Sequence, residues 1–258
     1  MDYRNFLAAA EKAALLAGNL LREGFGSSFG IANKEGRHNL VTEYDHRSEE
    51  AIIACIGAEF PDHSFLAEES GESGGGAAVR WIIDPLDGTV NFAHSIPIFC
   101  VSIAAEAAGE VVCGVIFQPL LGELFTAVRG GGAFLNGKRL NVSRTAALND
   151  AMLVTGFPYN VSSNPDNCID HFSAFLRVGI PIRRLGSAAL DLAYTAAGRF
   201  DGFWEARLNP WDVAAGALMV REAGGVVTDY DEREYRLGNG RIAASNGLIH
   251  REMLGILQ

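Results

Sequence analysis

The stretch WIIDPLDGTVNF, residues 81–92, decides how this chain is interpreted. Its apolar start predicts a buried strand, and Pro85 predicts that the strand ends at Asp84, because proline has no backbone N–H for a strand ladder. Asp84 and Asp87 are close in sequence, so we expect their carboxylates to face the same side of the tight turn that follows. Two acids therefore meet where the strand ends.

A helix N-terminus follows these acids and favours the opposite kind of ligand. Gly88 and Thr89 begin a predicted short helix, whose free N–H groups favour an anion such as a phosphate. Asp84 and Asp87 favour a hard cation such as Mg²⁺. A metal-bound phosphate satisfies both groups, whereas the simpler interpretation is that the two acids only cap the turn.

Length and composition indicate a soluble globular protein. The 258 residues, 48% of them hydrophobic, are enough to bury a substantial core. The chain has no apolar run long enough to span a membrane and no signal-peptide pattern, so we expect a cytoplasmic protein without membrane contact. A net charge of −10 argues against a nucleic-acid-binding surface, which needs Lys and Arg. The four cysteines lack Cys-x-x-Cys spacing, which favours free thiols over a zinc site or disulfides.

Hydrophobic periodicity predicts helices against an antiparallel sheet in the first half of the chain. The predicted helices cover 3–24 and 45–60, and the predicted strands cover 64–70, 99–106, 111–118 and 124–128. Asn136-Gly137 predicts a hairpin. The segment 24–39 has no period and predicts a loop or loose hairpin that could move over a site; Lys34 is its one lysine.

The second half alternates strands and helices, which predicts an αβ layer arrangement. The predicted strands cover 152–155, 182–184, 202–205, 226–229 and 242–244, and the predicted helices cover 166–178, 187–198, 212–223 and the C-terminus. The polar loop at 160–167 is the best candidate for a boundary between two halves of the chain. We divide the chain into an N-terminal α+β half, 1–145, and a C-terminal αβ half, 146–258, packed as one compact unit.

Several polar residues in these segments are candidates for a site, but each also has an ordinary explanation. Asp45 lies in the first turn of its helix, where the helix dipole accounts for an acid. Glu68 and Glu69 end a short strand, so only one of them can point inward. Asp212 begins a helix as an N-terminal acid commonly does. Gly186-Ser187-Ala188 begins another helix with small residues, which would leave backbone N–H groups accessible to a ligand.

Three separated motifs match one pattern: LAEES at 66–70, WIIDPLDGTVNF at 81–92 and WDVAAG at 211–216. Together they resemble the inositol monophosphatase family of Mg²⁺-dependent, Li⁺-sensitive phosphatases. The resemblance extends along nearly the whole chain, and three motifs in the right order are highly specific. It implies a layered αβαβα sandwich of the sugar-phosphatase type with an antiparallel-rich first sheet.

The resemblance also implies a set of metal ligands. Glu68, Asp84 and the Leu86 carbonyl would hold one Mg²⁺, and Asp84, Asp87 and Asp212 would hold a second. Two such metals can clamp both the entering water and the leaving oxygen of a phosphate ester. Carboxylate and carbonyl oxygens are the ligands that Mg²⁺ prefers.

The resemblance assigns catalytic roles to residues beside these ligands. Glu68 and Thr89 would orient and deprotonate the attacking water, while Gly88 and Thr89 would present N–H groups to the phosphate. Asp45 pairs with this threonine in the family, and the pairing would support Thr89 and help to hold a third, weaker ion.

The resemblance further implies positions that bind the substrate. The residues matching these positions are Asp87, Gly88, Thr89, Gly186, Ser187, Ala188, Glu205 and Asp212, and Lys34 matches a lysine of the mobile loop. One departure is Ala67, where many members have glycine before the paired glutamates. Its methyl group is expected to tilt the end of this strand slightly and so to alter the affinity for metal. Ser187, where threonine is common, is a smaller change.

The substrate is the least determined part of this interpretation. Related enzymes with this metal site also cleave fructose 1,6-bisphosphate, histidinol phosphate or adenosine 3′,5′-bisphosphate. An acid at Glu205 suits a neutral polyol and disfavours a second phosphate, so we expect inositol monophosphate, then histidinol phosphate, then a broad sugar-phosphate specificity. The alternative from another class is a regulatory binding protein with vestigial activity. A homodimer is implied by the family alone.

Overall fold

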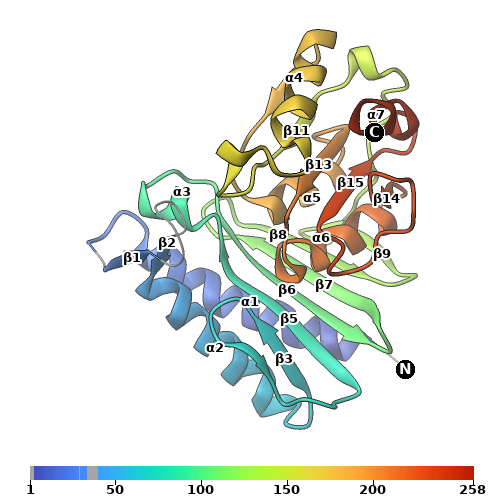
Figure 1. Cartoon of the computed structure of the whole chain (residues 1–258). Helices are drawn as coiled ribbons and strands as arrows, with labels where there is room; N and C mark the ends of the chain where they lie inside the picture. The colour runs from blue at the N-terminus through green and yellow to red at the C-terminus, as the bar shows by residue number, and fades with distance from the viewer. Residues whose placement is uncertain (1–2, 29, 34–39) are drawn as a thin grey trace.

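The computed structural model describes residues 3–28, 30–33 and 40–258, and its elements stack in alternating layers (Figure 1). A pair of helices, an eight-stranded sheet, a second pair of helices, a five-stranded sheet and a last pair of helices follow one another. Three separate hydrophobic cores fill the spaces between these layers. The structure therefore confirms the predicted αβαβα sandwich.

The first layer consists of α1 (Arg4–Gly24) and α2 (Glu43–Glu59), which lie against each other and against the large sheet. The buried face of α1 is rich in alanine, which lets its backbone approach the sheet closely. A capping box between Thr42 and Asp45 fixes the start of α2. Both helices were predicted, to within two residues at each end.

The large sheet is antiparallel except for one parallel pair, β3 with β5. Its order is β10-β9-β8-β7-β6-β5-β3-β4. The strands are β3 (Ser64–Ala67), β4 (Gly71–Ser73), β5 (Val79–Asp87), β6 (Cys100–Ala107), β7 (Glu110–Gln118), β8 (Glu123–Val128), β9 (Gly132–Leu135) and β10 (Lys138–Arg139). Successive side chains alternate between faces, so Trp81 and Ile83 pack towards α1 and α2 whereas Ile82 packs towards the middle helices.

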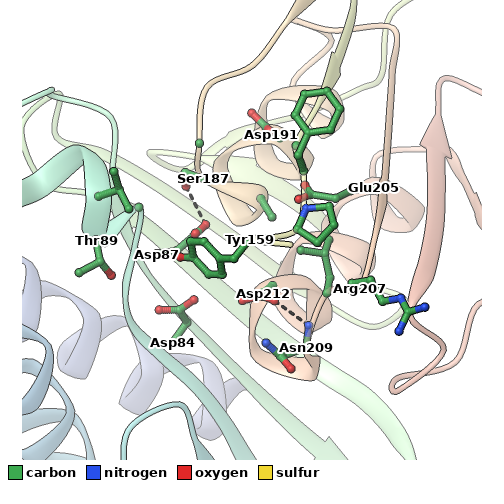
Figure 2. A pocket seen from close by; sticks show the side chains of 18 of the residues that line it. Asp84, Asp87, Thr89, Tyr159, Ser187, Asp191, Glu205, Arg207, Asn209 and Asp212 are labelled. Carbon is green, nitrogen blue, oxygen red and sulfur yellow. Dashed lines mark hydrogen bonds between the residues drawn. The ribbon is translucent and has the colours of Figure 1, made fainter. Parts of the chain in front are cut away.

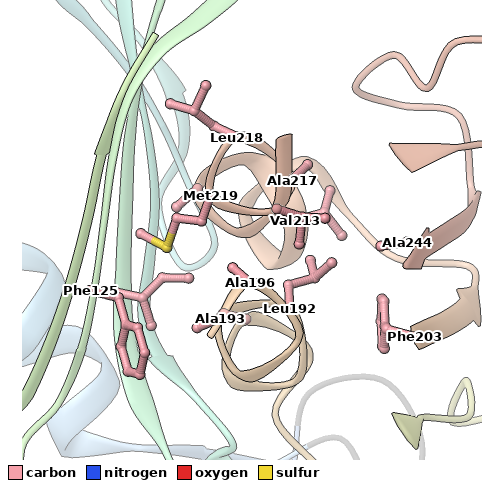
Figure 3. Close-up of a cluster of buried hydrophobic side chains, with 14 of the residues drawn as sticks. Phe125, Leu192, Ala193, Ala196, Phe203, Val213, Ala217, Leu218, Met219 and Ala244 are labelled. Atoms are coloured by element: carbon pink, nitrogen blue, oxygen red, sulfur yellow. The ribbon is translucent and has the colours of Figure 1, made fainter. Parts of the chain in front are cut away.

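The middle helices, α5 (Ala188–Ala196) and α6 (Pro210–Glu222), are buried between the two sheets. Figure 3 shows Leu192 and Val213 of these helices facing Phe203 of the small sheet, and Phe125 of the large sheet on the other side. Helices enclosed in this way are apolar on most faces. An acidic side chain within them therefore requires a specific explanation.

The small sheet has the order β12-β11-β13-β15-β14, with parallel pairing around β11 and antiparallel pairing around β15. Its strands are β11 (Leu153–Thr155), β12 (Ile182–Arg183), β13 (Gly202–Ala206), β14 (Val226–Thr228) and β15 (Arg241–Ser245). The helices α4 (Cys168–Val178) and α7 (His250–Leu257) cover its outer face.

The remaining elements are short. The hairpin of β1 (Ile31–Asn33) and β2 (Leu40–Thr42) lies beside α3 (Thr89–Ala93). Three 3₁₀ turns, η1 (Leu148–Asp150), η2 (Val161–Ser163) and η3 (Pro165–Asn167), lie in the second half. The large sheet ends at Arg139 and the small sheet begins at Leu153, so the polar loop at 160–167 follows the first strand of the small sheet. Among the described residues, no helix has the length and apolar character needed to cross a membrane.

Candidate active site

A cavity of about 960 Å³ lies where the two halves of the chain meet. Its walls come from the end of β5, the N-termini of α3, α5 and α6, and the end of β13 (Figure 2). Its lining includes every predicted metal ligand, namely Glu68, Asp84, Leu86, Asp87 and Asp212. The structure therefore brings together side chains that are up to 144 positions apart in the sequence.

The strand that carries Asp84 does not end there as predicted. β5 continues to Asp87, and its pairing with β6 shifts register between Asp84 and Asp87. A bulge of this kind accommodates Pro85, because the residue without an N–H is not required to complete the ladder. The bulge keeps both carboxylates at the cavity, where Asp84 Oδ1 accepts a hydrogen bond from the Leu86 N–H at 3.1 Å.

The pKa values of the acids in the cavity are raised by burial and by the negative charges of their neighbours. Burial raises the pKa of Asp84 well above its ordinary value, and the negative charges of Glu68, Asp87 and Asp212 raise it further. Burial also raises the pKa of Asp87 to about 6, although hydrogen bonds from Ser187 and Ala189 lower it. Carboxyl groups with raised pKa values at a cavity are typical of a functional site.

Gly88 and Thr89 shape the turn after β5. Gly88 has φ +97°, and a Cβ there would lie 2.8 Å from the carbonyl oxygen of Ile98, so only glycine fits. The hydroxyl of Thr89 lies 3.0 Å from Asp45 Oδ1 and 3.0 Å from the Leu86 carbonyl oxygen. The predicted pairing of Thr89 with Asp45 is therefore present.

Asp45 lies behind Thr89 and is fully buried without lining the cavity. Its Oδ2 accepts hydrogen bonds from the N–H and the hydroxyl of Thr42, at 2.7 and 2.6 Å. Burial raises the pKa of Asp45, and these hydrogen bonds together with the one from Thr89 lower it. Asp45 therefore caps α2 and also contacts Thr89.

The paired glutamates lie in the turn after β3 and not on the strand itself. Glu68 lines the main cavity, whereas Glu69 lines a smaller surface hollow beside α2. The carboxylate of Glu49 accepts hydrogen bonds from the N–H groups of Glu69 and Ser70, at 2.8 and 2.9 Å, which fixes this turn. As predicted, only one glutamate of the pair faces the cavity.

The second half contributes Asp212 at the start of α6. Its Oδ2 accepts a hydrogen bond from the Asn209 N–H at 2.6 Å and completes a capping box. Burial raises the pKa of its carboxyl well above the ordinary value, and the charge of Asp87 raises it further. Asp212 therefore caps α6 while its carboxyl group faces the acids of the first half.

The N-terminus of α5 differs from the prediction. Gly186, Ser187 and Ala188 do line the cavity, but the Ala189 and Leu190 N–H groups of the first turn are already bonded. Asp87 Oδ2 accepts hydrogen bonds from the Ser187 hydroxyl and the Ala189 N–H, both at 2.7 Å. A ligand at this point therefore meets a carboxylate that is anchored on a helix end instead of a row of free N–H groups.

Glu205, on β13, lies at the far end of the cavity and is 7% exposed. Burial raises its pKa to about 8; Arg184 lowers it and Asp87 raises it. Gly156 gives this carboxylate room, because a Cβ there would overlap its oxygens. Figure 2 shows Glu205 and Asp191 at one end of the cavity and Asp84 and Thr89 at the other.

Several residues that line the cavity were not predicted from the sequence. They include Arg184, Asp191, Arg207 and the segment 156–161. Asp191 carries the one signal that could have been used, since it is an acid within an apolar predicted helix. Lys34 lies outside the described residues.

Among the described residues, no three His, Cys, Asp or Glu side chains lie close enough together to bind one metal ion as they stand. Asp84, Asp87 and Asp212 each accept hydrogen bonds from neighbouring backbone N–H groups.

The layered fold and the acid-lined cavity at its helix ends are compatible with a metal-dependent phosphatase. The model of the inositol monophosphatase family matches residues 2–258, and the chain belongs to that family.

Relatives with established names agree with this assignment. An inositol-1-monophosphatase of Mesorhizobium japonicum is 44% identical over 94% of this chain and 92% of its own. The protein named Nus factor SuhB of Escherichia coli is 43% identical over 96% of this chain and 94% of its own.

Solved structures give the same result. An inositol monophosphatase from Anabaena has a TM-score of 0.91 and 42% identity, with 100% of this chain and 96% of that chain covered. The extragenic suppressor protein suhB of Bartonella henselae has a TM-score of 0.93 and 41% identity, with 98% of each chain covered.

Proposed function

We propose that the protein hydrolyses inositol monophosphate to inositol and phosphate with Mg²⁺. The observation that carries the proposal is the convergence of Asp84, Asp87 and Asp212 at one cavity without a cationic partner. No described Lys or Arg forms an ion pair with any of the three. Clustered buried carboxylates need compensating positive charge, which divalent cations supply.

The donor atoms suit Mg²⁺ as the cofactor. Glu68, Asp84 and the Leu86 carbonyl would hold one ion, and Asp84, Asp87 and Asp212 a second, so that every protein ligand is an oxygen atom. When bound, the ions would stabilise the charge of the phosphate and lower the pKa of the attacking water. We propose two ions and allow a third, weaker one near Asp45.

Thr89 and Asp45 would move the proton of the attacking water together with Glu68. The Thr89 hydroxyl has a single proton and two acceptors at equal distance, Asp45 Oδ1 and the Leu86 carbonyl oxygen. An ionised carboxylate is the stronger acceptor. Donation to Asp45 leaves a lone pair of Thr89 for the water, and it leaves the Leu86 oxygen free to bind a cation.

The alcohol of the substrate would lie on the side of Glu205. Gly88 and Thr89 would hold the phosphate, while Gly186, Ser187 and Ala188 form the wall between phosphate and alcohol. An acid at the alcohol end favours hydroxyl groups over a second phosphate. Histidinol phosphate is the next candidate and a broad sugar-phosphate specificity, including fructose 1,6-bisphosphate, the third.

The proposal is tested by measuring phosphate release from inositol 1-phosphate, histidinol phosphate, fructose 1,6-bisphosphate and adenosine 3′,5′-bisphosphate, with Mg²⁺ and with Mg²⁺ plus Li⁺. We expect preference for the inositol ester, dependence on Mg²⁺ and inhibition by Li⁺. Asp84→Asn should abolish release, whereas the exposed Asp150→Asn serves as the matched control. Preference for another ester would replace the substrate, and no release from any ester would overturn the enzymatic proposal.

A second candidate function is that of a regulatory binding protein with vestigial activity. Relatives named Nus factor SuhB, 43% identical to this chain, favour testing it. Asp84→Asn separates the two functions, because it would remove catalysis while leaving the outer surface unchanged. Full cellular function in this variant would favour the binding role.

The family also suggests a homodimer located in the cytoplasm, which we add to the proposal. We also propose that the chain divides into halves 1–145 and 146–258, with metal ligands mostly in the first half and Asp212 in the second. Gel filtration coupled to light scattering would test the dimer. A molar mass in solution equal to that of one chain would reject it.

A further inference from the structure

The carboxyl group of Asp191 is a buried polar group that the proposed mechanism does not use. Asp191 lies on α5, is 1% exposed and lines the cavity. Neither of its carboxyl oxygens has a hydrogen-bond partner. Buried polar groups nearly always have a partner, so a carboxyl group left without one at a cavity points to a ligand.

Helix capping does not explain this acid, although Asp191 lies in the first turn of α5. The Ala189 N–H donates to Asp87 and the Leu190 N–H donates to the Ser187 hydroxyl. The N–H of Asp191 itself donates to the Ser187 carbonyl oxygen at 3.0 Å. These donors of the first turn are therefore bonded without any contribution from the Asp191 side chain.

The surroundings of Asp191 fit the alcohol part of a substrate. Glu205 lies at the same end of the cavity, across from Asp84 and Thr89 (Figure 2). No described residue donates a hydrogen bond to the Glu205 side chain in the structure. A hydroxyl group of a neutral polyol can donate to an ionised carboxyl group and accept from a protonated one. It can therefore satisfy two acids that have no hydrogen-bond partner, although the positive charge of Arg184 acts on both.

We infer that Asp191 is a specificity-determining residue that forms a hydrogen bond with a hydroxyl group of the substrate alcohol, on the side away from the phosphate. The inference rests on the proposed function, because it assigns a ligand group to the same cavity. It adds a residue that the resemblance did not place in the site.

The chemistry distinguishes a hydroxyl ligand from a cationic one. Asparagine keeps the shape of Asp191 and offers both an acceptor and a donor, so it can still bind a hydroxyl group. It cannot supply the negative charge that an ammonium group would need. Asp191→Leu removes both abilities. The pair of variants therefore separates hydrogen bonding from charge.

The experiment compares inositol 1-phosphate with p-nitrophenyl phosphate, which has no alcohol hydroxyl groups, in the wild type, Asp191→Asn and Asp191→Leu. The measured quantity is the ratio of kcat/KM for the two esters. We expect this ratio to fall about tenfold in Asp191→Leu, mainly through KM for the inositol ester, as is typical for a lost hydrogen bond. Asp191→Asn should stay within about threefold of the wild type.

Controls separate binding from folding. Thermal melts of all variants show which are folded, and Asp191→Asn remains informative if Asp191→Leu does not fold. The exposed Asp150→Asn should leave the ratio unchanged. An equal loss for both esters would assign Asp191 a structural role and overturn the inference.

Two further outcomes are decisive. A loss in Asp191→Asn as large as in Asp191→Leu, together with wild-type preference for ethanolamine phosphate over the inositol ester, would identify a cation as the ligand and overturn the inference. Absence of phosphate release from both esters by the wild-type protein would instead overturn the proposed function itself.

Discussion

Replacing Glu205 with glutamine tests how much the buried acid at the alcohol end of the cavity destabilises the protein. Burial raises the pKa of Glu205 from its ordinary value of 4.5 to about 8. The unfolded chain therefore releases this proton more readily, and unfolding becomes easier as the pH rises from 4.5 to 8. The resulting loss of stability is about 3 kcal/mol at pH 7 and about 1 kcal/mol at pH 5.

Glu205→Gln removes this ionisation. The free energy of unfolding of the variant minus that of the wild type should therefore be about 2–3 kcal/mol larger at pH 7 than at pH 5, because only the wild type loses stability over this range. For a chain of this size the difference corresponds to roughly 5 °C or more in Tm. Activity towards the inositol ester should fall in the same variant, which would show stability exchanged for function.

The assay is urea or thermal unfolding of both proteins at pH 5 and pH 7, in EDTA so that no divalent cation alters the local charges. Glu252→Gln, an exposed glutamate on α7, is the matched control and should show no pH-dependent difference. The reasoning is refuted if Glu205→Gln and wild type change equally in stability between pH 5 and pH 7.

Three further predictions concern Gly88 and Thr89, in the turn after β5, and His250, at the start of α7. Gly88→Ala should destabilise the protein by about 1–3 kcal/mol in urea unfolding and reduce phosphate release, because the new Cβ would lie 2.8 Å from the Ile98 oxygen. Unchanged unfolding would contradict this. Thr89→Val should lower kcat by about 100-fold or more in steady-state assays, because the hydroxyl that contacts Asp45 is lost; a loss below tenfold would reject the role of Thr89. Burial lowers the pKa of His250, so its protonation favours the unfolded chain as the pH falls below 6.5. His250→Asn should therefore reduce the loss of Tm between pH 6.5 and pH 5, and parallel curves would refute this.

Periodicity in the sequence was sufficient to predict most of the helices and strands, whereas the five-layer arrangement was expected from the family resemblance. The apolar faces of α1 and α2, and the alternation in β6 and β7, come directly from the spacing of side chains. The extension of β5 past Pro85 was not predictable in this way. A bulge depends on the partner strand, which local sequence does not reveal.

For the candidate site, the sequence predicted the acidic residues but not the contacts that they make. The motifs identified the acids, and the structure places them around one cavity. The bonded N-terminus of α5 was missed because its partner, Asp87, lies in the other half of the chain. Asp191 was missed because an acid within an apolar helix becomes significant only when its surroundings in three dimensions are known.

The anchoring of α5 by Asp87 has a consequence for folding kinetics. The bond from Ser187 to Asp87 joins residues 100 positions apart, and the bond from Ala189 joins residues 102 positions apart. Contacts of such long sequence separation close large loops and form slowly. We therefore expect the large sheet, built mostly from neighbouring hairpins, to form before this junction. Catalytic competence should then appear in the last kinetic phase of refolding, after most of the backbone structure has returned.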